Sequence, residues 1–325
     1  MAQPLIETER LKLVDALADG AWHSGETLAE ASGISRAALA KRVEKLRDWG
    51  LDVEARQGLG YRLPQPLERL DAQRIRALLE APLRFDLLTA TDSTNTRLLD
   101  SDAAQDPQAL LAEYQTAGRG RRGRDWRSPF AANLYLSLAW SFPAWPPGLS
   151  ALPLVVGVLC AQALRETGVG DIGLKWPNDL YVRGRKLGGI LIEHRGEAGG
   201  SCRVVIGIGI NVAMSAAQAA GIEQAWITVD EALGEGRHAS RNALAAALLG
   251  RLAGGVARFQ REGFDAFSAD WAAHDLAHGR AVRVLQGDRE LQGIGRGVDA
   301  QGALIVEALG QYHTLHSGEI SLRLE

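Results

Sequence analysis

Residues 115–128 read Gln-Thr-Ala-Gly-Arg-Gly-Arg-Arg-Gly-Arg-Asp-Trp-Arg-Ser and hold five arginines, three glycines and one acid. No run of apolar residues gives this stretch a side that could face a core. Arginine forks make charge-assisted hydrogen bonds to phosphate oxygens, and glycine lets backbone N–H groups approach an anion closely. The stretch therefore predicts an anion-binding loop, although a charge run taken alone is as often only a solvated loop.

Other polar segments accompany this loop in a fixed order. Residues 91–96 (Thr-Asp-Ser-Thr-Asn-Thr) precede it, and residues 175–179 (Lys-Trp-Pro-Asn-Asp) follow it. Further on come residues 184–191 (Gly-Arg-Lys-Leu-Gly-Gly-Ile-Leu) and 207–211 (Gly-Ile-Gly-Ile-Asn). In this order and spacing the segments resemble those of the biotin protein ligases. An N-terminal helix-turn-helix and the C-terminal Ser317-Gly318-Glu319-Ile320-Ser321-Leu322-Arg323 extend the resemblance to nearly all of the 325 residues.

The resemblance is to the bifunctional bacterial members, in which a biotin ligase and a biotin operon repressor share one chain. It implies an ATP-dependent enzyme that forms biotinyl-5'-AMP and transfers biotin to a lysine of the biotin carboxyl carrier protein of acetyl-CoA carboxylase. It also implies repression at operator DNA with biotinyl-5'-AMP as co-repressor. Adenylation needs no protein nucleophile, but it needs cations that neutralise phosphoryl charge. The segments are rich in Arg, Lys and Gly and contain no Ser–His–Asp or Cys–His arrangement.

Two other functions are compatible with these segments. A ligand-sensing repressor without ligase activity would keep a biotin site, but it would not need the arginine loop or Lys186. A lipoate-type acyl ligase is the second alternative. The N-terminal helix-turn-helix and the Lys-Trp-Pro-Asn-Asp segment favour biotin over lipoate. We therefore expect biotin and ATP with Mg²⁺ as substrates, and no permanently bound prosthetic group.

The overall composition limits the partners and the compartment. The length predicts two or three domains, and a formal net charge of −3 means that any DNA contact must come from a local basic patch. Cys160 and Cys202 are predicted to be buried thiols of a reducing cytosol. Because the N-terminus shows no apolar leader and the apolar stretch 151–164 is too short to cross a bilayer, we expect a cytoplasmic protein without a membrane partner.

The N-terminal region has the pattern of a DNA-binding module. Helical periodicity predicts a first helix over 8–19, and Ser24 and Ser35 are predicted N-caps of two more helices. Residues 53–63 indicate a hairpin. Residues 1–63 are therefore predicted to form a winged helix-turn-helix DNA-binding domain, and residues 64–67 a short, stiff, proline-rich linker.

Residues 68–274 are predicted to form the biotin- and ATP-binding catalytic domain, of the α/β (α+β) class. Strands are expected at 85–90, 109–114, 134–140, 172–176, 188–194 and 203–211, and long helices at 149–167 and 241–261. This order predicts a mixed sheet. Over 275–325, short strands separated by turn residues predict a small β-barrel, which the family resemblance identifies as SH3-like.

The resemblance also assigns roles to individual residues. The expected catalytic cations are Lys186, Arg119 and Arg121. The expected biotin-binding residues are Ser93, Thr94, Asn95, Gln115, Arg119, Gly120, Arg121, Lys186, Gly207 and Gly209. The expected ATP- or adenylate-binding residues are Arg119, Arg121, Arg122, Arg124, Trp126, Lys175 and Asn211. Glycines alternating within a strand often mark the close approach of a ligand, so the flat ring of biotin is expected on Gly207 and Gly209.

Several of these residues also have a purely structural interpretation. In the structural interpretation, Ser93 or Thr94 is only a helix N-cap, and Trp126 is a side chain of the core. Lys186 would be a solvated hairpin lysine, and residues 175–179 a turn. Asp179 is expected to orient the incoming lysine or a magnesium-bound water. His274 and His278 lack a third ligand, so no metal site is expected.

The segment between Ser35 and Arg47 carries five cations against one acid. Such a local excess predicts a phosphate-binding face on the third helix. The expected DNA-binding residues are Ser35, Arg36, Lys41, Arg42, Lys45 and Arg56. The alternative is a winged helix that contacts only protein. Because one winged helix reads a half-site poorly, an adenylate-linked homodimer is expected.

Overall fold

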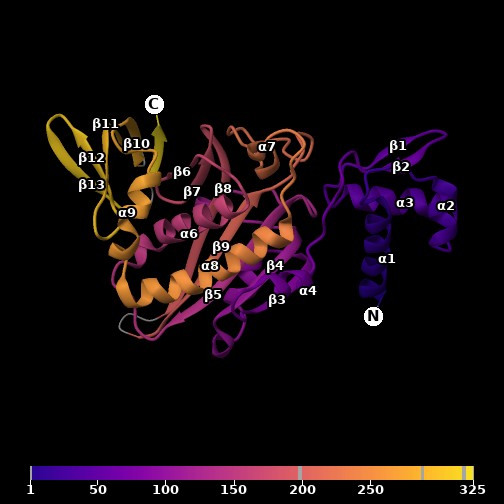
Figure 1. The fold of residues 1–325 in the computed structure, drawn as a ribbon, viewed down its shortest axis with the longest axis horizontal. Helices are drawn as coiled ribbons and strands as arrows, with labels where there is room; N and C mark the ends of the chain where they lie inside the picture. The colour runs from indigo at the N-terminus through magenta and orange to yellow at the C-terminus, as the bar shows by residue number, and fades with distance from the viewer. Residues whose placement is uncertain (1, 197–199, 287–288, 317–319, 325) are drawn as a thin grey trace.

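The computed structural model describes residues 2–196, 200–286, 289–316 and 320–324. Gly287-Asp288 and Ser317-Gly318-Glu319, the start of the C-terminal segment, lie outside the described residues. Figure 1 shows a helical N-terminal domain at one end of the molecule, a large sheet domain in the middle and a small all-β domain at the other end.

The N-terminal domain is the predicted winged helix-turn-helix. It contains α1 (Ala2–Leu17), α2 (Gly25–Ala31), α3 (Arg36–Arg47) and the hairpin of β1 (Glu54–Arg56) and β2 (Gly60–Arg62). Both predicted caps are confirmed, because the Oγ atoms of Ser24 and Ser35 each accept a hydrogen bond of 3.2 Å from a backbone N–H in the first turn. α1 begins earlier than the predicted residue 8, since Pro4 is tolerated in a first helical turn.

The central domain is built on the predicted mixed sheet. Its seven strands are ordered β3-β4-β5-β9-β8-β7-β6, with β3 parallel to β4 and every other pair antiparallel. The strands are β3 (Arg84–Thr91), β4 (Gln108–Gln115), β5 (Asn133–Phe142), β6 (Ile172–Lys175), β7 (Asp179–Val182), β8 (Arg185–Gly196) and β9 (Cys202–Asn211). β7 was not predicted, because it has four residues and lies between two turns.

Helices cover one face of this sheet almost completely. α6 (Leu152–Glu166) and α8 (Arg241–Glu262) pack there with α4 (Ala72–Leu78) and α9 (Asp265–His274), as Figure 1 shows. The segment Leu149–Glu166 is long and apolar enough to cross a membrane, but 67% of it is buried inside the structure. The interpretation of this stretch as a buried helix is confirmed, and both cysteines are buried free thiols.

The opposite face of the sheet is left partly open. The short helix α5 (Thr94–Leu99) packs there against β4, β5 and β9 through Leu98 and its neighbours. Side chains alternate along β9, so Ile206, Ile208 and Ile210 enter the helix-covered core while Gly207 and Gly209 face the open side. The remaining short elements are α7 (Val229–Leu233) and the 3₁₀ helices η1 (Ala103–Gln105), η2 (Arg121–Gly123) and η3 (Leu149–Ala151).

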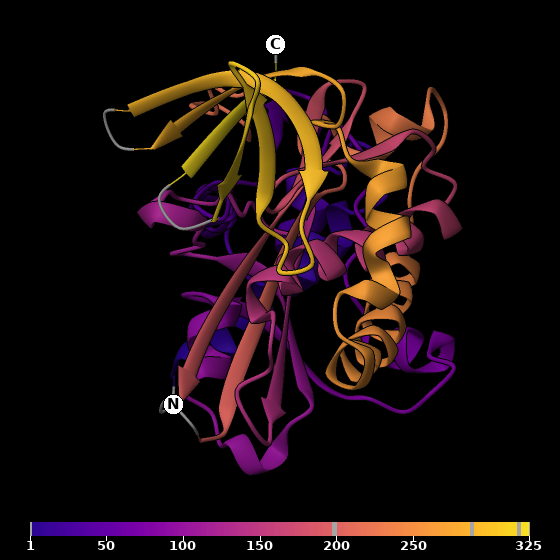
Figure 2. The same ribbon diagram turned by 90° about the vertical axis from the view of Figure 1, so that its left-hand side faces the viewer.

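The C-terminal domain is a five-stranded antiparallel sheet in the order β13-β12-β11-β10-β14, and Figure 2 shows it curving over one end of the central domain. Its strands are β10 (Ala281–Gln286), β11 (Arg289–Val298), β12 (Leu304–Ala308), β13 (Gln311–Leu315) and β14 (Ile320–Leu324). This arrangement confirms the predicted small β domain. A hydrogen bond of 3.0 Å from Trp176 Nε1 to the Gly302 carbonyl joins it to the central domain.

The N-terminal domain is joined to the central domain by more than the linker. Trp49, just beyond α3, stacks on Phe130 with ring centroids 4.8 Å apart, and the Phe130 N–H donates to the Trp49 carbonyl at 2.9 Å. Phe130 is fully buried in the core of the winged helix domain. Gln218 Nε2 donates to the Gly50 carbonyl at 2.7 Å. The turn that follows α3 is therefore fixed against the central domain.

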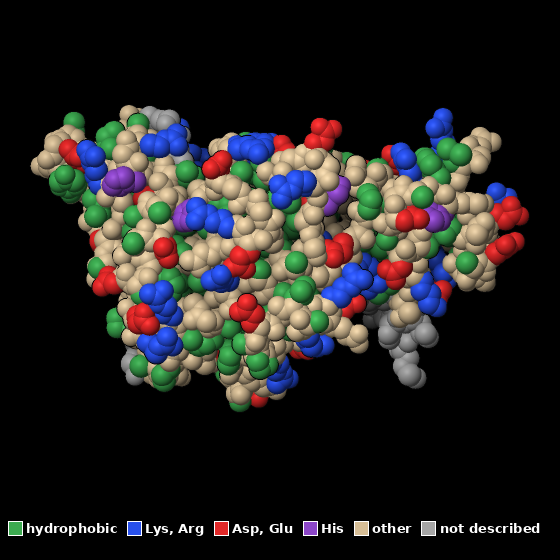
Figure 3. Space-filling view, in the orientation of Figure 1, with side chains coloured by type: hydrophobic (Ala, Val, Ile, Leu, Met, Phe, Trp, Pro, Cys, Tyr) green, Lys and Arg blue, Asp and Glu red, His purple; other side chains and the backbone are tan. Residues whose placement is uncertain are grey.

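On the face seen in Figure 3, basic and acidic side chains are interspersed, and no large patch carries charge of one sign. This distribution agrees with the small net charge. Recognition of charged ligands must therefore depend on local groups.

Candidate active site

A pocket opens on the free face of the central sheet, beside α5. All the residues expected to bind biotin or ATP line it. They are Ser93, Thr94, Asn95, Gln115, Arg119, Gly120, Arg121, Arg122, Arg124, Trp126, Lys175, Lys186, Gly207, Gly209 and Asn211. Segments far apart in the sequence thus meet at one place, as the resemblance implied.

The floor of the pocket is the glycine side of β9. A Cβ atom on Gly207 would lie 2.2 Å from Asn95 Oδ1, and one on Gly209 would lie 2.4 Å from the Trp126 indole. The predicted close approach to these glycines is therefore present. In this structure, however, the groups that lie on the glycines are protein side chains, Asn95 and Trp126.

A hydrogen-bonded cluster of small polar side chains forms one end of the pocket. The Thr94 N–H donates to Gln115 Oε1 at 2.9 Å, and Gln115 Nε2 donates to Ser128 Oγ at 3.0 Å. Ser137 Oγ, on β5, lies 2.7 Å from Thr94 Oγ1 and 2.6 Å from Asn95 Oδ1. Ser93 caps α5 through a bond of 3.5 Å from the Thr96 N–H. The cap and a place in the pocket are therefore compatible.

The arginine loop folds back on itself over the pocket. The Gly120 N–H donates to the Arg124 carbonyl at 2.7 Å, and the Trp126 N–H donates to the Gly118 carbonyl at 2.9 Å. Between these bonds Arg122 adopts a left-handed backbone with φ of 59°, which is strained for a residue with a Cβ. The short turn presents its arginines to the pocket from one side.

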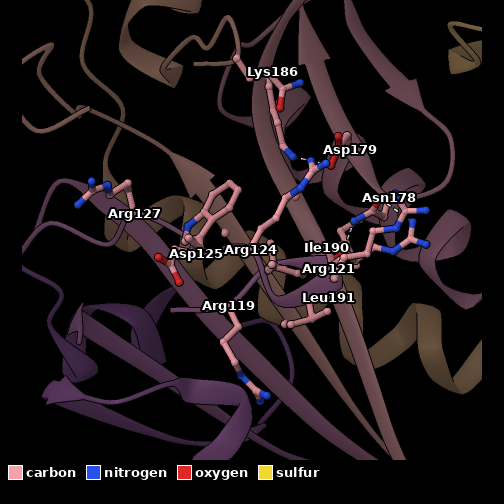
Figure 4. Close-up of a pocket in the computed structure, with 18 of the residues that line it drawn as sticks. Arg119, Arg121, Arg124, Asp125, Arg127, Asn178, Asp179, Lys186, Ile190 and Leu191 are labelled. Carbon is pink, nitrogen blue, oxygen red and sulfur yellow. Dashed lines mark hydrogen bonds and ion pairs between the residues drawn. The ribbon is translucent and has the colours of Figure 1, made fainter. Parts of the chain in front are cut away.

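The loop arginines point in different directions. Arg121 Nη1 donates to Asn178 Oδ1 at 3.2 Å, and Arg124 extends toward Asp179 (Figure 4). Burial and then the nearby Arg122 guanidinium lower the pKa of Arg121. The Arg119 side chain is directed away from Lys186 (Figure 4), and its Nη2 lies 2.9 Å from a carboxylate oxygen of Glu193. Arg119 and Arg121 therefore contact different partners, Glu193 and Asn178, and the binding of a phosphate by the two together stays a prediction.

Lys186 stands opposite the loop, at the start of β8. Its Nζ lies 2.7 Å from Asp179 Oδ1 and 5.7 Å from the centroid of the Trp126 ring, and only 21% of its side chain is exposed. Its backbone N–H donates to the Ala225 carbonyl at 2.9 Å. These contacts exclude the alternative of a solvated hairpin lysine. Asn211 Nδ2 donates to the Lys186 carbonyl at 3.4 Å, so Asn211 supports the lysine backbone.

A second lysine lies deeper in the pocket. Lys175 is buried, its Nζ donates to the Tyr181 hydroxyl at 3.5 Å, and desolvation lowers its pKa. Burial also raises the pKa of Tyr181 to about 12. The Lys-Trp-Pro-Asn-Asp segment is both a turn and part of the site, since Asn178 Nδ2 donates to the Ile190 carbonyl at 2.7 Å.

The structure adds residues that the sequence did not single out. Ser137 on β5 and Glu193 on β8 hydrogen-bond to side chains that line the pocket, and their period-two positions in the strands are the sequence signal that they lie on the pocket side of the sheet. Arg323 on β14 lines the pocket, and its charge contributes to the lowered pKa of Lys175. The small β domain therefore supplies a cation to the site of the central domain.

The expected DNA-binding residues divide into two groups. Arg42 Nη1 lies 3.1 Å from Glu9 Oε2, and Lys45 Nζ lies 2.8 Å from Asp48 Oδ2. Ser35 is occupied by its capping bond. Arg36, Lys41 and Arg56 are exposed and form no ion pair within the part of the chain that the structure describes. Fewer cations of α3 are therefore available to bind DNA phosphates than its sequence indicates.

A metal site at His274 and His278 has no support among the described residues. No group of three His, Cys, Asp or Glu side chains there is placed to hold a metal ion. His274 is buried, and its Nδ1 lies 2.7 Å from the Ile172 carbonyl oxygen.

Fold and site together define a winged helix-turn-helix protein whose central domain holds an anion-binding pocket, because the pocket is lined by several Arg and Lys side chains and by glycine. Family models match the Biotin/lipoate A/B protein ligase family over residues 87–211, the Biotin protein ligase C terminal domain over 277–323 and an HTH domain over 9–62. The chain belongs to the biotin protein ligase family and has the domain organisation of its bifunctional ligase/repressors.

Individual relatives agree with this assignment. The bifunctional ligase/repressor BirA of Salmonella typhimurium is 46% identical over 97% of this chain and 98% of its own length, and that of Escherichia coli is 45% identical over the same shares. The solved biotin protein ligase from Aquifex aeolicus in complex with biotin and ATP has a TM-score of 0.63 and 30% identity. The match covers 74% of this chain and 99% of the Aquifex aeolicus chain.

Proposed function

We propose that this protein forms biotinyl-5'-AMP from biotin and ATP, and then transfers biotin to a lysine of the biotin carboxyl carrier protein. The observation that carries the proposal is that the polar cluster around Thr94 and Gln115 and the cations Lys175, Lys186 and Arg121 line the same pocket. One end of this pocket suits a neutral polar head group. The other end suits a carboxylate and a phosphate.

The chemistry requires little beyond position and charge. The biotin carboxylate attacks the α-phosphorus of ATP and pyrophosphate leaves; the lysine amine then attacks the acyl-adenylate and AMP leaves. Lys186, Arg121 and Arg124 would hold and neutralise the reacting anions, while Trp126 would exclude water. We propose that Mg²⁺ enters with ATP, and that Asp179 faces the phosphates. The enzyme would work in the cytoplasm without a permanently bound prosthetic group.

The test is pyrophosphate release from the purified protein with ATP and either biotin or lipoate. Release that depends on biotin is the expected result. Release with lipoate alone would favour the lipoate-type ligase. Biotin binding without any pyrophosphate release would favour the sensing repressor, although such a sensor would not need the two lysines and the arginine loop.

We also propose that the protein represses transcription at operator DNA with biotinyl-5'-AMP as co-repressor, acting as a homodimer. Arg36, Lys41 and Arg56 are the exposed cations available to DNA phosphates. The arginine loop ends at Ser128, two residues before Phe130, which stacks on Trp49 beyond α3. Ligand at the loop can therefore influence the recognition helix as well as a dimer interface.

Biotin and ATP together are expected to raise operator affinity by at least about tenfold, a usual size for coupling between sites. Either substrate alone should have little effect, because neither forms the adenylate. Operator titration and sedimentation under the three conditions measure affinity and dimer fraction. If both substrates together change neither quantity, the regulatory proposal fails while the ligase proposal stands.

A further inference from the structure

Glu193 is a carboxylate that bonds to two pocket-lining residues and that the proposed chemistry does not use. It lies on β8, two residues beyond the pocket-lining Leu191 and on the same side of the strand. Its Oε2 accepts hydrogen bonds of 2.9 Å from Asn95 Nδ2 and 2.9 Å from Arg119 Nη2. Only 24% of its side chain is exposed. One carboxylate oxygen thus holds a residue of α5 and a residue of the arginine loop.

The contacts with Glu193 and Leu191 together decide which way the Asn95 carboxamide points, and the bond to Glu193 is the shorter of the two. Asn95 Nδ2 faces the Glu193 carboxylate and, at 3.3 Å, the Leu191 carbonyl. Both of these groups can only accept hydrogen bonds, so the nitrogen of Asn95 must be on their side. The oxygen of Asn95 is then turned the other way, where it lies against Gly207 and 2.6 Å from Ser137 Oγ.

Asn95 therefore presents an acceptor, and not a donor, at the glycine floor of the pocket. A carbonyl oxygen has two lone pairs, and Ser137 can use one of them. The remaining acceptor site suits an N–H group of a ligand lying on β9. Asn95 is 3% exposed, so an unmatched polar group at this position would not be compensated by bulk water.

We infer that Glu193 is a specificity-determining residue, which fixes Asn95 as a hydrogen-bond acceptor and so selects a head group carrying N–H donors. The ureido ring of biotin has two such N–H groups, whereas the dithiolane ring of lipoate has none. This inference rests on the proposed function and names the basis of its substrate choice. Glu193 acts through Asn95 and does not touch the reacting atoms. Arg119 balances the charge of Glu193 and holds the carboxylate next to Asn95.

Glu193→Ala is expected to weaken biotin binding by about tenfold, because Asn95 Nδ2 then keeps only the longer bond of 3.3 Å to the Leu191 carbonyl and the carboxamide is held less firmly with its oxygen toward the ligand. Titration calorimetry with biotin alone measures this step without ATP. In pyrophosphate release, KM for biotin should rise while kcat at saturating biotin stays within about threefold. Desthiobiotin, which keeps the ureido ring and lacks the ring sulfur, should be weakened by the same factor as biotin.

Two further variants separate this role from a general loss of structure. Glu193→Gln keeps an amide oxygen that can accept from Asn95, so it should recover most of the biotin affinity. Asp100→Ala removes the partner of Arg195, an exposed ion pair that joins the end of α5 to the same strand β8, and it should leave biotin affinity unchanged. Thermal melts of all variants verify that each is folded.

The outcomes distinguish the two proposals. If the wild-type protein releases no pyrophosphate with biotin, the proposed function fails. If it is active but Glu193→Ala binds biotin with wild-type affinity, the inference about Glu193 is wrong. A lower kcat and a higher KM for ATP, with biotin affinity unchanged, would also contradict it, since that pattern would arise through Arg119. Weakening of biotin with no effect on desthiobiotin would place the contact at the sulfur ring.

Discussion

Lys186→Ala is expected to slow adenylate formation by about a hundredfold, the usual result of removing one preorganised group that stabilises developing charge. Lys186 is the half-buried cation at the start of β8, with its Nζ 2.7 Å from Asp179. Removing it takes away a positive charge and leaves the Asp179 carboxylate unpaired beside the incoming phosphates. The change should appear in the rate of pyrophosphate release at saturating biotin and ATP.

The neighbouring Arg185 provides a matched control. Arg185 lies 2.6 Å from Glu231 in a partly exposed ion pair, so Arg185→Ala should alter the rate by less than about twofold, as is usual for surface pairs. Pyrophosphate release at the wild-type rate in Lys186→Ala would contradict the assignment of Lys186.

The features that could be predicted from the sequence are those carried by local pattern. Helix caps at Ser24 and Ser35, the alternating strand β5 and the apolar helix α6 each depend on neighbouring residues. The residues expected in the pocket were inferred from the family resemblance, and the structure brings them together. The four-residue strand β7 was missed because its pattern is too short to separate from the turns around it.

What could not be predicted are pairings between distant residues. The sequence shows Arg42 and Lys45 as free cations of the third helix, but Glu9 on α1 pairs with the first and Asp48 pairs with the second. Likewise the contact of Arg119 with Glu193 spans 74 positions of the chain. Such contacts depend on tertiary packing, and neither periodicity nor spacing contains them.

The same limit applies to a buried ion pair that fixes residues 68–70, the segment after the linker, to the rest of the central domain. Arg241, at the start of α8, has its Nη2 2.7 Å from Glu113 Oε2 on β4, and both side chains are 3% exposed. Arg241 also donates to the Asn133 carbonyl at 2.7 Å and to the Glu68 carbonyl at 2.8 Å. Glu113 Oε1 accepts a bond of 2.6 Å from the Leu70 N–H. The pair thus joins the sheet, α8 and the segment that follows the linker.

Glu113→Ala is expected to lower the free energy of unfolding by about 3–5 kcal/mol, because it leaves the buried Arg241 charge without its counter-charge. The Leu70 N–H loses its acceptor at the same time. Denaturant unfolding followed by tryptophan fluorescence gives the shift in midpoint. Glu166→Ala is the matched control: its ion pair with Arg251 is exposed, so the loss should be at most about 1 kcal/mol.

The double variant Glu113→Leu with Arg241→Met decides whether the unpaired charge is the cause. Replacing both partners of a buried pair by apolar residues is often much less harmful than removing one. The double variant should therefore be more stable than Arg241→Met or Glu113→Leu alone. If the losses of the single variants simply add in the double variant, the two side chains act independently, and the destabilisation comes from lost packing.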